Sequence, residues 1–249
     1  MKRLSELSIF FPCYNEEANV QRVTQAAVAA AERFAERFEI IIVNDGSRDR
    51  TGEIADRLAA ETPTVRAVHN SPNLGYGGAV ARGLREARYE WIFFTDGDGQ
   101  FDIGQLDKLI SLLDTCDFAV GFRINRADSF IRRVNAYCWG VLVRAMFGLK
   151  VRDIDCAFKL LPKSLIDQIE LKSGGALIST ELLARARYRG YKIAEVGVNH
   201  YPRVAGQQTG AKFGVIFRAF KELFKLRRDI RGEGWRDAPT ARSSNADRP

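Results

Sequence analysis

The sequence is poor in the residues that build zinc sites and disulfide frameworks. Its 249 residues include four cysteines and two histidines, and no two cysteines have CxxC spacing. Zinc fingers and disulfide-stapled domains need these residues in larger numbers or at closer spacing. We therefore expect neither a zinc site nor a disulfide framework, and reduced thiols in a cytosolic protein are the simple interpretation.

Long apolar runs are also missing. No stretch approaches the ~18 consecutive apolar residues that indicate a transmembrane helix. The apolar run at 9–11 is too short for the core of a secretory signal. These absences predict a cytoplasmic protein. The GxGxxG signature does not follow the first predicted strand, which argues against a nicotinamide-dependent oxidoreductase.

Positive charge is in excess, with 38 Lys and Arg residues against 31 Asp and Glu residues and a formal net charge of +7. This balance favours an anionic partner, such as nucleic acid, anionic lipid or a phosphorylated small molecule. Hydrophobic residues make up 46% of the chain and charged residues 28%, which is ordinary globular usage. A substantial core is therefore expected.

Short apolar runs alternate with helical patterns in the first half of the chain. The predicted strands are 8–11, 39–43, 65–69, 90–95 and 117–120, and the predicted helices are 17–37, 50–61, 77–88 and 105–114. This alternation predicts an α/β fold with a mostly parallel sheet and helices on both faces. In such sheets, ligands bind outside the carboxyl ends of the strands.

The pattern changes after about residue 125. A helical stretch at 129–149, a helix at 179–189, a strand at 192–198 and an amphipathic helix at 211–231 follow. The tail at 232–249 lacks periodicity and is predicted to be disordered. We therefore expect one main domain over 1–210, a separate C-terminal helix at 211–231 and the tail.

Two carboxylates and a carboxamide follow the fourth predicted strand. Asp96 and Asp98 alternate along the chain, so a strand that continued through them would place both on one face. Hard cations such as Mg²⁺ take oxygen ligands and commonly keep phosphate oxygens as well. With Gln100, this segment indicates a metal–diphosphate site, although a solvated turn is the simpler alternative.

Other polar loops follow the preceding strands. Residues 12–16 and 44–47 each come directly after a strand, and Asp45 can either belong to a capped turn or bind a base or ribose. The glycine-rich segment 73–79 opens a helix, where it serves either phosphate binding or close packing. The convergence of three strand-end loops on one edge is the stronger indication of a site.

The later part of the chain offers candidates for binding an acidic second substrate and a membrane. Four arginines are candidates for the acidic substrate, although a solvated role is the alternative for each: Arg123, Arg132, Arg133 and Arg203. In the helix at 211–231, phenylalanines recur at helical spacing among lysines and arginines. Such a helix either adsorbs to anionic lipid or docks on the protein's own core or at a dimer interface.

Taken together, the loops resemble the ordered motifs of a known enzyme family. The segments PCYNEE (12–17), NDGS (44–47), DGDGQ (96–100) and DIDCAF (153–158) occur in this order. The set resembles family-two glycosyltransferases of the GT-A fold, and within them the polyprenyl-phosphate (dolichol-phosphate) mannosyl- and glucosyltransferases. The sequence departs from their pattern at Gly97, Gly99, Phe101 and Asp102, at Tyr76, where a basic residue is common, and after Gly206.

The resemblance implies a role for each matching residue. Pro12, Tyr14, Glu16 and Asp45 would bind the nucleotide, and Asp96 would lie against the nucleotide sugar. Asp98 and Gln100 would hold Mg²⁺ or Mn²⁺ against the diphosphate. Arg123, Arg132 and Arg203 would bind the acceptor phosphate. Asp155, with Asp153 close by, would be the catalytic carboxylate.

The prediction is an inverting, metal-dependent glycosyltransferase. It would move a hexose from a UDP- or GDP-linked sugar to a polyprenyl or dolichyl phosphate at the cytoplasmic face of a membrane. Two alternatives stay open: a soluble glycosyltransferase that uses a saccharide hydroxyl, and a noncatalytic nucleotide-sugar-binding subunit. Nucleic-acid binding would explain the charge but not the carboxylate loops.

Overall fold

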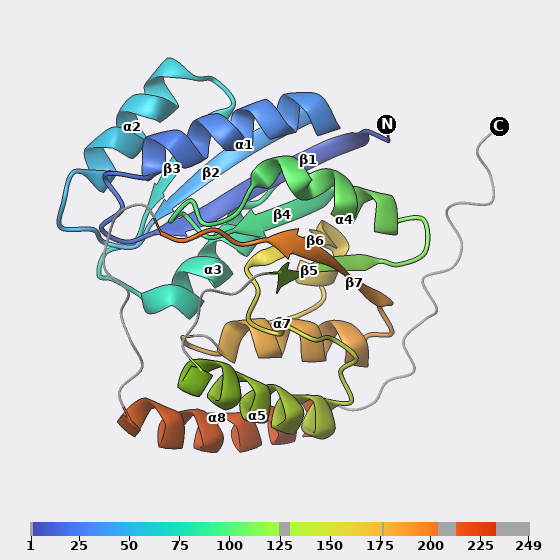
Figure 1. Ribbon diagram of the computed structural model, residues 1–249. Helices are drawn as coiled ribbons and strands as arrows, with labels where there is room; N and C mark the ends of the chain where they lie inside the picture. Colours follow the sequence, from blue (N-terminus) through green and yellow to red (C-terminus); the bar gives the residue numbers. More distant parts are fainter. Residues whose placement is uncertain (1, 125–129, 176, 204–212, 233–249) are drawn as a thin grey trace.

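The structure is a computed structural model, and it describes residues 2–124, 130–175, 177–203 and 213–232 (Figure 1). Within these ranges, the side chains of 130–138 and 213–221 are not described. Almost all of the tail predicted to be disordered, at 232–249, therefore lies outside the described residues.

In the part of the chain that the structure describes, seven strands form one sheet in the order β3-β2-β1-β4-β6-β5-β7. Their bounds are β1 Leu4–Cys13, β2 Ala35–Asn44, β3 Val65–His69, β4 Trp91–Thr95, β5 Phe118–Ile124, β6 Phe158–Pro162 and β7 Ile193–Asn199. All neighbouring strands pair in parallel except β6, which is antiparallel to both β4 and β5. The predicted mostly parallel α/β sheet is confirmed.

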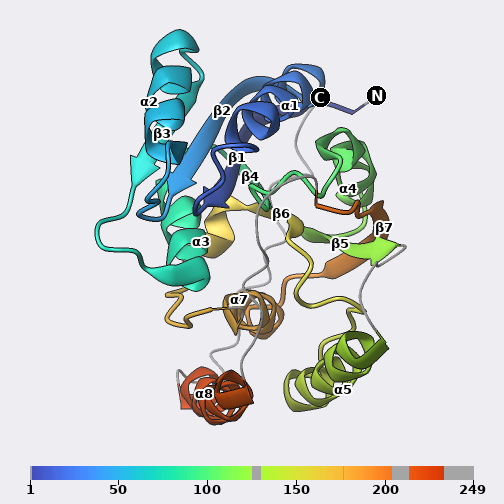
Figure 2. The ribbon, with the colours of Figure 1, turned by 60° about the vertical axis from the view of Figure 1, so that its left-hand side comes forward.

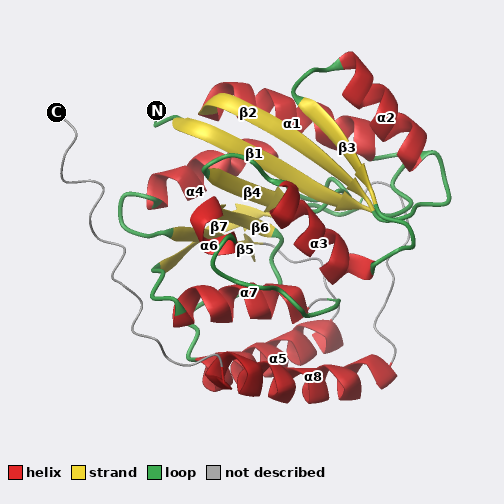
Figure 3. Cartoon of the chain, turned by 180° about the vertical axis from the view of Figure 1, so that it is seen from behind, coloured by secondary structure: helices red, strands yellow, loops and turns green. Residues whose placement is uncertain are grey.

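Helices cover both faces of the sheet, as predicted (Figure 3). Their bounds are α1 Val20–Phe34, α2 Thr51–Glu61, α3 Gly75–Glu86, η1 Ile103–Gln105, α4 Leu106–Leu112, α5 Phe130–Phe147, α6 Lys163–Ile166, α7 Leu177–Tyr188 and α8 Phe213–Gly232. Helices α1, α2 and α4 lie on one face, and α3 and α7 lie on the other. Helices α5 and α8 form an outer layer beyond α7 (Figures 1 and 2).

The core consists of strands that are buried on both sides. Strands β1 and β2 carry near-continuous apolar runs, as expected for parallel strands covered on two faces. Aromatic rings link the strands: Phe10 stacks on Phe94 at 5.4 Å, and Phe93 meets Phe158 edge-on at 4.7 Å. This packing makes the sheet a rigid base for the loops at its carboxyl edge.

The strand order creates a crevice at one point of that edge. From β1 the chain proceeds to β2 and β3 on one side, whereas β4 lies on the other side of β1. Connections that leave in opposite directions open a crevice at the carboxyl ends of β1 and β4. Because β6 is antiparallel to β4, with Phe158 opposite Thr95, the turn that precedes β6 reaches this same edge.

Several boundaries differ from the sequence prediction by up to four residues, and one strand was not predicted. The helix predicted at 17–37 ends at Phe34, and β2 begins at Ala35, four residues before the predicted strand. Strand β6 was not predicted at all, because it is five residues long and carries a lysine within its apolar run. The predicted C-terminal helix is confirmed as α8, within two residues at each end.

Candidate active site

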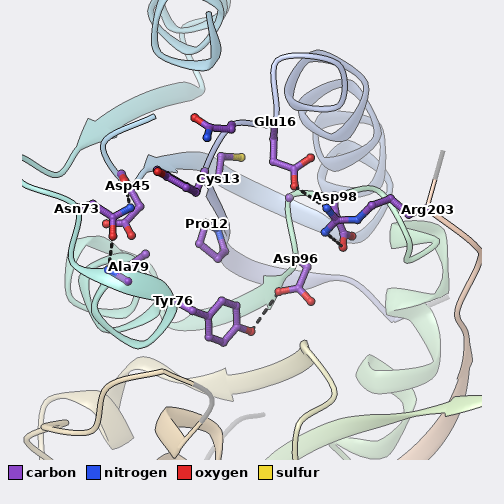
Figure 4. Close-up of a pocket in the computed structure, with 14 residues that line it drawn as sticks. Pro12, Cys13, Glu16, Asp45, Asn73, Tyr76, Ala79, Asp96, Asp98 and Arg203 are labelled. Carbon is purple, nitrogen blue, oxygen red and sulfur yellow. Dashed lines mark hydrogen bonds and ion pairs between the residues drawn. The ribbon is translucent and has the colours of Figure 1, made fainter. Parts of the chain in front are cut away.

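A pocket of about 750 Å³ opens at the crevice between β1 and β4 (Figure 4). It is lined by residues 12–16 at and beyond the end of β1, Asp45 after β2, parts of 73–79 around the start of α3, 96–98 after β4, and Arg203. The three strand-end loops that the sequence indicated therefore meet around one cavity. Arg203 joins them from the segment that follows β7.

Asp45 is held rigidly at one end of the pocket. Its carboxylate Oδ1 accepts hydrogen bonds from the Asn70 side chain and the Leu74 backbone N–H, both at 2.9 Å. The Asn73 side chain donates to the Asp45 carbonyl. The glycine-rich segment thus fixes the orientation of Asp45, so the turn and the site are one structure.

The loop after β1 is joined to the loop after β2. The Asn15 backbone N–H donates to Ser47 Oγ at 3.0 Å, and the Arg48 N–H donates to Asn15 Oδ1 at 2.8 Å. Asn15 adopts a left-handed conformation (φ 56°) that brings the chain into this contact. Tyr14 remains 42% exposed and lines the pocket, so a flat ligand has an aromatic face available there.

Asp96 lines the same pocket and meets Tyr76 (Figure 4). The Tyr76 hydroxyl donates to Asp96 Oδ1 at 3.1 Å. Burial and, second, the nearby charge of Asp98 raise the pKa of Asp96 to about 7, which the hydrogen bond from Tyr76 opposes. Tyr76 is a site residue to which the sequence analysis gave no role, although its position in the glycine-rich segment was noted.

Asp98 forms an ion pair with Arg203. Asp98 Oδ2 is 2.8 Å from an Arg203 guanidinium nitrogen, and a second nitrogen of Arg203 is 3.4 Å from Glu16. Asp98 Oδ1 accepts the Gln100 backbone N–H at 3.0 Å, and the Gln100 side chain donates to the Tyr201 carbonyl at 2.9 Å. Gln100 therefore ties the segment carrying Arg203 to the loop after β4.

The donor atoms fit a hard divalent cation that shares its coordination with a ligand. Asp96 and Asp98 supply carboxylate oxygens at one edge. The pKa of Asp96 is raised first by burial and second by the charge of Asp98, and a bound cation would favour the ionised form of both carboxylates. Among the described residues, no group of three or more His, Cys, Asp or Glu side chains forms a metal cage. A cation bound here would complete its coordination with diphosphate or water oxygens.

The turn before β6 carries the predicted catalytic carboxylates. Arg123 binds Asp153 through two hydrogen bonds of 2.7 and 2.8 Å. Below the turn, the buried Lys159 of β6 donates to two backbone carbonyls, those of Ile154 and Cys156. The sequence analysis missed Lys159, and the available signal was a single charged residue inside an apolar run.

The predicted acceptor arginines do not form one cluster among the described side chains. Arg123 pairs with Asp153, Arg203 pairs with Asp98, and the side chain of Arg132 lies outside the described residues. Their role toward an acceptor phosphate stays a prediction. Both described arginines already contact carboxylates that were assigned to other tasks.

Each of the two interpretations of the amphipathic pattern of helix α8 applies to a different side of the helix. Leu223, Leu226 and Ile230 are buried, and α8 packs on α7, so part of its apolar side docks on the protein's own core. Phe224 is 59% exposed and borders a shallow basic surface with Arg228 and Arg231. Within the described ranges, no helix has the length and apolar character needed to cross a bilayer.

The family follows from comparison with known proteins. The model of glycosyl transferase family 2 matches residues 8–170, which include every carboxylate discussed above. The chain therefore belongs to glycosyl transferase family 2. It is an α/β glycosyltransferase with a GT-A-like fold, as its motifs predicted.

Curated relatives refine the comparison. The chain is 31% identical over 225 residues to dodecaprenyl-phosphate galacturonate synthase of Rhizobium johnstonii, a match that covers 89% of this chain and 65% of the relative. It is 32% identical over 208 residues to glycosyltransferase AglD of Haloferax volcanii (80% and 33%). It is 27% identical to undecaprenyl-phosphate mannosyltransferase of Micrococcus luteus (80% and 86%). The first two relatives are thus matched over about a third to two thirds of their length.

Solved structures share the fold. Glucosyl-3-phosphoglycerate synthase of Mycobacterium tuberculosis in complex with UDP superposes with a TM-score of 0.67 at 18% identity, covering 92% of this chain and 80% of that one. The same enzyme with Mn²⁺, UDP-glucose and phosphoglyceric acid gives a TM-score of 0.65 at 17% identity. At this identity the likeness establishes the fold.

Proposed function

We propose that this glycosyltransferase moves a hexose from a UDP- or GDP-linked sugar to a polyprenyl phosphate, with inversion at the anomeric carbon. The observation that carries the proposal is the set of carboxylates Asp45, Asp96 and Asp98 around one pocket at the β1–β4 crevice. Relatives named for transfer to dodecaprenyl, undecaprenyl and dolichyl phosphates support the choice of acceptor.

The nucleotide half of the donor would occupy the outer part of the pocket. Pro12, Tyr14, Glu16 and Asp45 would hold the base and ribose, with Tyr14 as a stacking face and Asp45 as a fixed hydrogen-bond acceptor. The rigid loop contacts around Asp45 support this assignment, because a preorganised acceptor loses little entropy when the ligand binds. Asp96, which meets Tyr76 across the pocket, would contact the sugar.

Asp98 and Gln100 would hold the metal at the diphosphate. When bound, Mg²⁺ or Mn²⁺ supplies Lewis-acid stabilisation of the charge that develops on the leaving diphosphate. The side-chain amide of Gln100 already donates to the Tyr201 carbonyl, so its oxygen is oriented by that bond. Arg203 would have to leave Asp98 for this carboxylate to take up the cation.

The acceptor would approach from the side of β5, β6 and β7. Its phosphate would bind Arg123, Arg132 and Arg203, and Asp155, with Asp153 beside it, would face the reacting carbon. A phosphate is already ionised near neutral pH, so it needs little help from a base. Asp155 would then orient the reactants and stabilise the positive charge developing at the anomeric carbon.

We assign the transferase domain to residues 1–210 and a membrane-surface role to the following helix. The exposed Phe224, Arg228 and Arg231 of α8 support peripheral binding to anionic lipid on a cytoplasmic membrane face. Lipid-linked acceptors are presented at such a surface. A helix that docks one side on α7 can still offer its opposite side to lipid.

The test is a screen of radiolabelled UDP- and GDP-sugars with Mn²⁺ or Mg²⁺, each with undecaprenyl phosphate, dolichyl phosphate or simple saccharides. Transfer of radiolabel into an organic-soluble, acid-labile product supports the proposal. Transfer only to saccharides would establish the soluble-enzyme alternative, in which Asp155 must accept a proton and the rate should rise with pH through its pKa. Donor binding without transfer to any acceptor would support the noncatalytic alternative.

A further inference from the structure

Lys159 is a charged side chain in the centre of the sheet. It lies in β6 and is 0% exposed. Moving an ammonium group out of water costs several kcal/mol unless partners replace the lost hydration. No step of the proposed transfer has used Lys159 so far. A buried cation next to a site with several carboxylates is therefore a candidate for a role in that site.

The partners of Lys159 surround one residue. Its Nζ donates to the carbonyl oxygen of Ile154 at 3.2 Å and also to the carbonyl oxygen of Cys156. These two residues are the neighbours of Asp155 in the chain. The Ile154 carbonyl belongs to the peptide unit that precedes Asp155, and the Cys156 carbonyl to the unit that follows Cys156. Holding both restrains the short segment between them, and the backbone of that segment sets the direction of the Asp155 Cα–Cβ bond.

Two further contacts keep the ammonium group in place. Ser179 Oγ on α7 is 3.3 Å from Lys159 Nζ, and the Phe94 ring of β4 lies 5.2 Å from it. Lys159 therefore connects the turn before β6 to the neighbouring strand and to the helix below the sheet. The turn is positioned by rigid elements rather than by its own flexible backbone.

The electrostatic surroundings agree with this geometry. Burial lowers the pKa of Lys159, and the nearby Asp155, Asp153 and Asp96 act in the opposite direction. On the other side of the turn, Arg123 grips Asp153 with two hydrogen bonds. Arg123 thus holds the turn at Asp153, and Lys159 holds it at the carbonyls of Ile154 and Cys156.

We propose that Lys159 is a positioning residue that directs the Asp155 carboxylate toward the transferring sugar by clamping the carbonyls on either side of it. This inference rests on the proposed function, in which Asp155 faces the reacting carbon. Lys159 would affect the reaction without contacting the substrate. If Lys159 only stabilised the fold, the effect of replacing it would not depend on whether Asp155 is present.

The experiment is a double-mutant cycle of Lys159→Met and Asp155→Asn, with Lys163→Met as the control. Methionine keeps the length of the side chain but donates no hydrogen bond. Lys163 is a nearby lysine at the start of α6 that pairs with Asp167, just after that helix. We expect Lys159→Met to lower kcat by about 10²-fold, the cost of a misplacement near 1 Å. The Kd for UDP or GDP with Mn²⁺ should stay within about twofold, since the nucleotide is held elsewhere.

The cycle separates positioning from stability. If Lys159 acts through Asp155, the double variant is no slower than Asp155→Asn alone, because the interaction removed is the same one. The inference is overturned if the two losses of kcat multiply in the double variant, or if Asp155→Asn keeps the wild-type kcat. Ser179→Ala removes only one partner of the ammonium group and should lower kcat slightly at unchanged nucleotide Kd. If Lys159→Met does not fold, Ser179→Ala with Asp155→Asn forms the cycle.

A crystal structure of the Lys159→Met protein, or of Ser179→Ala in its place, gives a readout that does not depend on activity. We expect the Asp155 carboxylate to move relative to β4, by about 1 Å for Lys159→Met and by less for Ser179→Ala. An unmoved carboxylate in the variant overturns the inference even if transfer is established. A moved carboxylate together with an inactive wild-type enzyme would place the failure in the proposed function instead.

Discussion

The two halves of the sheet hold their charged side chains in different ways. Around β1, β2 and β4, the loops bind each other through backbone and amide hydrogen bonds, so the carboxylates of Asp45 and Asp96 face the pocket. Around β5, β6 and β7, the described arginines and the buried lysine are paired with carboxylates or carbonyls. The side assigned to the nucleotide is preformed at Asp45 and Asp96. The cations assigned to the acceptor must exchange partners to bind a phosphate, and Asp98 must likewise release Arg203 to bind a metal.

The largest expected effect is at Asp98, which joins the two sides through its ion pair with Arg203. Asp98→Asn keeps the shape of the side chain but removes the charge proposed to hold the metal. We expect kcat/KM to fall by ~10³-fold or more, since metal charge stabilisation is worth several kcal/mol. Initial rates and Mn²⁺ binding by electron paramagnetic resonance measure the change. Asp114→Asn, an exposed residue paired with Lys2, is the control. Full activity of Asp98→Asn would falsify the assignment.

On the acceptor side, Arg203→Ala should act mainly on acceptor affinity. A hydrogen bond to a charged group contributes about 1.5–3 kcal/mol, so the acceptor KM should rise roughly 10- to 100-fold. The donor KM should change far less. Steady-state kinetics with each substrate varied in turn give the comparison, and Arg57→Ala on α2 is the control. Equal changes in both KM values would mean that Arg203 serves the donor instead.

Helix α8 offers a smaller effect, on lipid rather than on chemistry. Replacing the exposed Arg228 and Arg231 by glutamine should weaken binding to phosphatidylglycerol vesicles about 30-fold, at roughly 1 kcal/mol for each charge. Substitution is preferable to deleting 211–231, because deletion would uncover buried residues of the α7–α8 contact. Vesicle sedimentation at low and high salt measures binding. Binding that is insensitive to both the substitutions and the salt contradicts a membrane role for this surface.

The prediction furthest from activity concerns the dependence of the free energy of unfolding on pH in the presence of a chelator. The folded protein raises the pKa of Asp96 from 3.8 to about 7, so between these values the folded state holds a proton that the unfolded state releases. Stability from this group is therefore present at low pH and is lost as pH rises toward 7. The free energy of unfolding of Asp96→Asn, measured with urea, should therefore increase relative to that of the wild type as pH rises from 4 to 7.5. A constant difference across that range would show that Asp96 titrates normally.

The sequence allowed one half of this comparison to be predicted better than the other. Strands β1, β2 and β4 are parallel, so the rule that ligands bind at carboxyl ends was enough to group the loops after them. The turn with Asp155 precedes its strand, and it reaches the same edge only because β6 runs antiparallel. That reversal left no periodic signal in a five-residue strand, so Asp155 was identified through family resemblance alone.

The contacts made by individual cations were beyond prediction for another reason. Arg203 and Asp98 are 105 residues apart, and Arg123 and Asp153 are 30 apart. Such pairs depend on the positions of whole strands, and no local pattern encodes them. Lys159 was missed because a charge in an apolar strand normally marks an exposed edge, whereas here β6 lies between β4 and β5.

The place of β6 also bears on how the chain is made. Strand β5 is synthesised before β6 but lies beyond it in the sheet, so β5 has no neighbour on the β4 side until Pro162 has left the ribosome. The nucleotide half, with strands β1 to β4 in local succession, can pair earlier. During that interval one side of β4 is an unpaired edge, the kind of surface that recruits other strands. Substitutions that delay the insertion of β6 would therefore reduce the yield of folded protein before they reduce the activity of the molecules that fold.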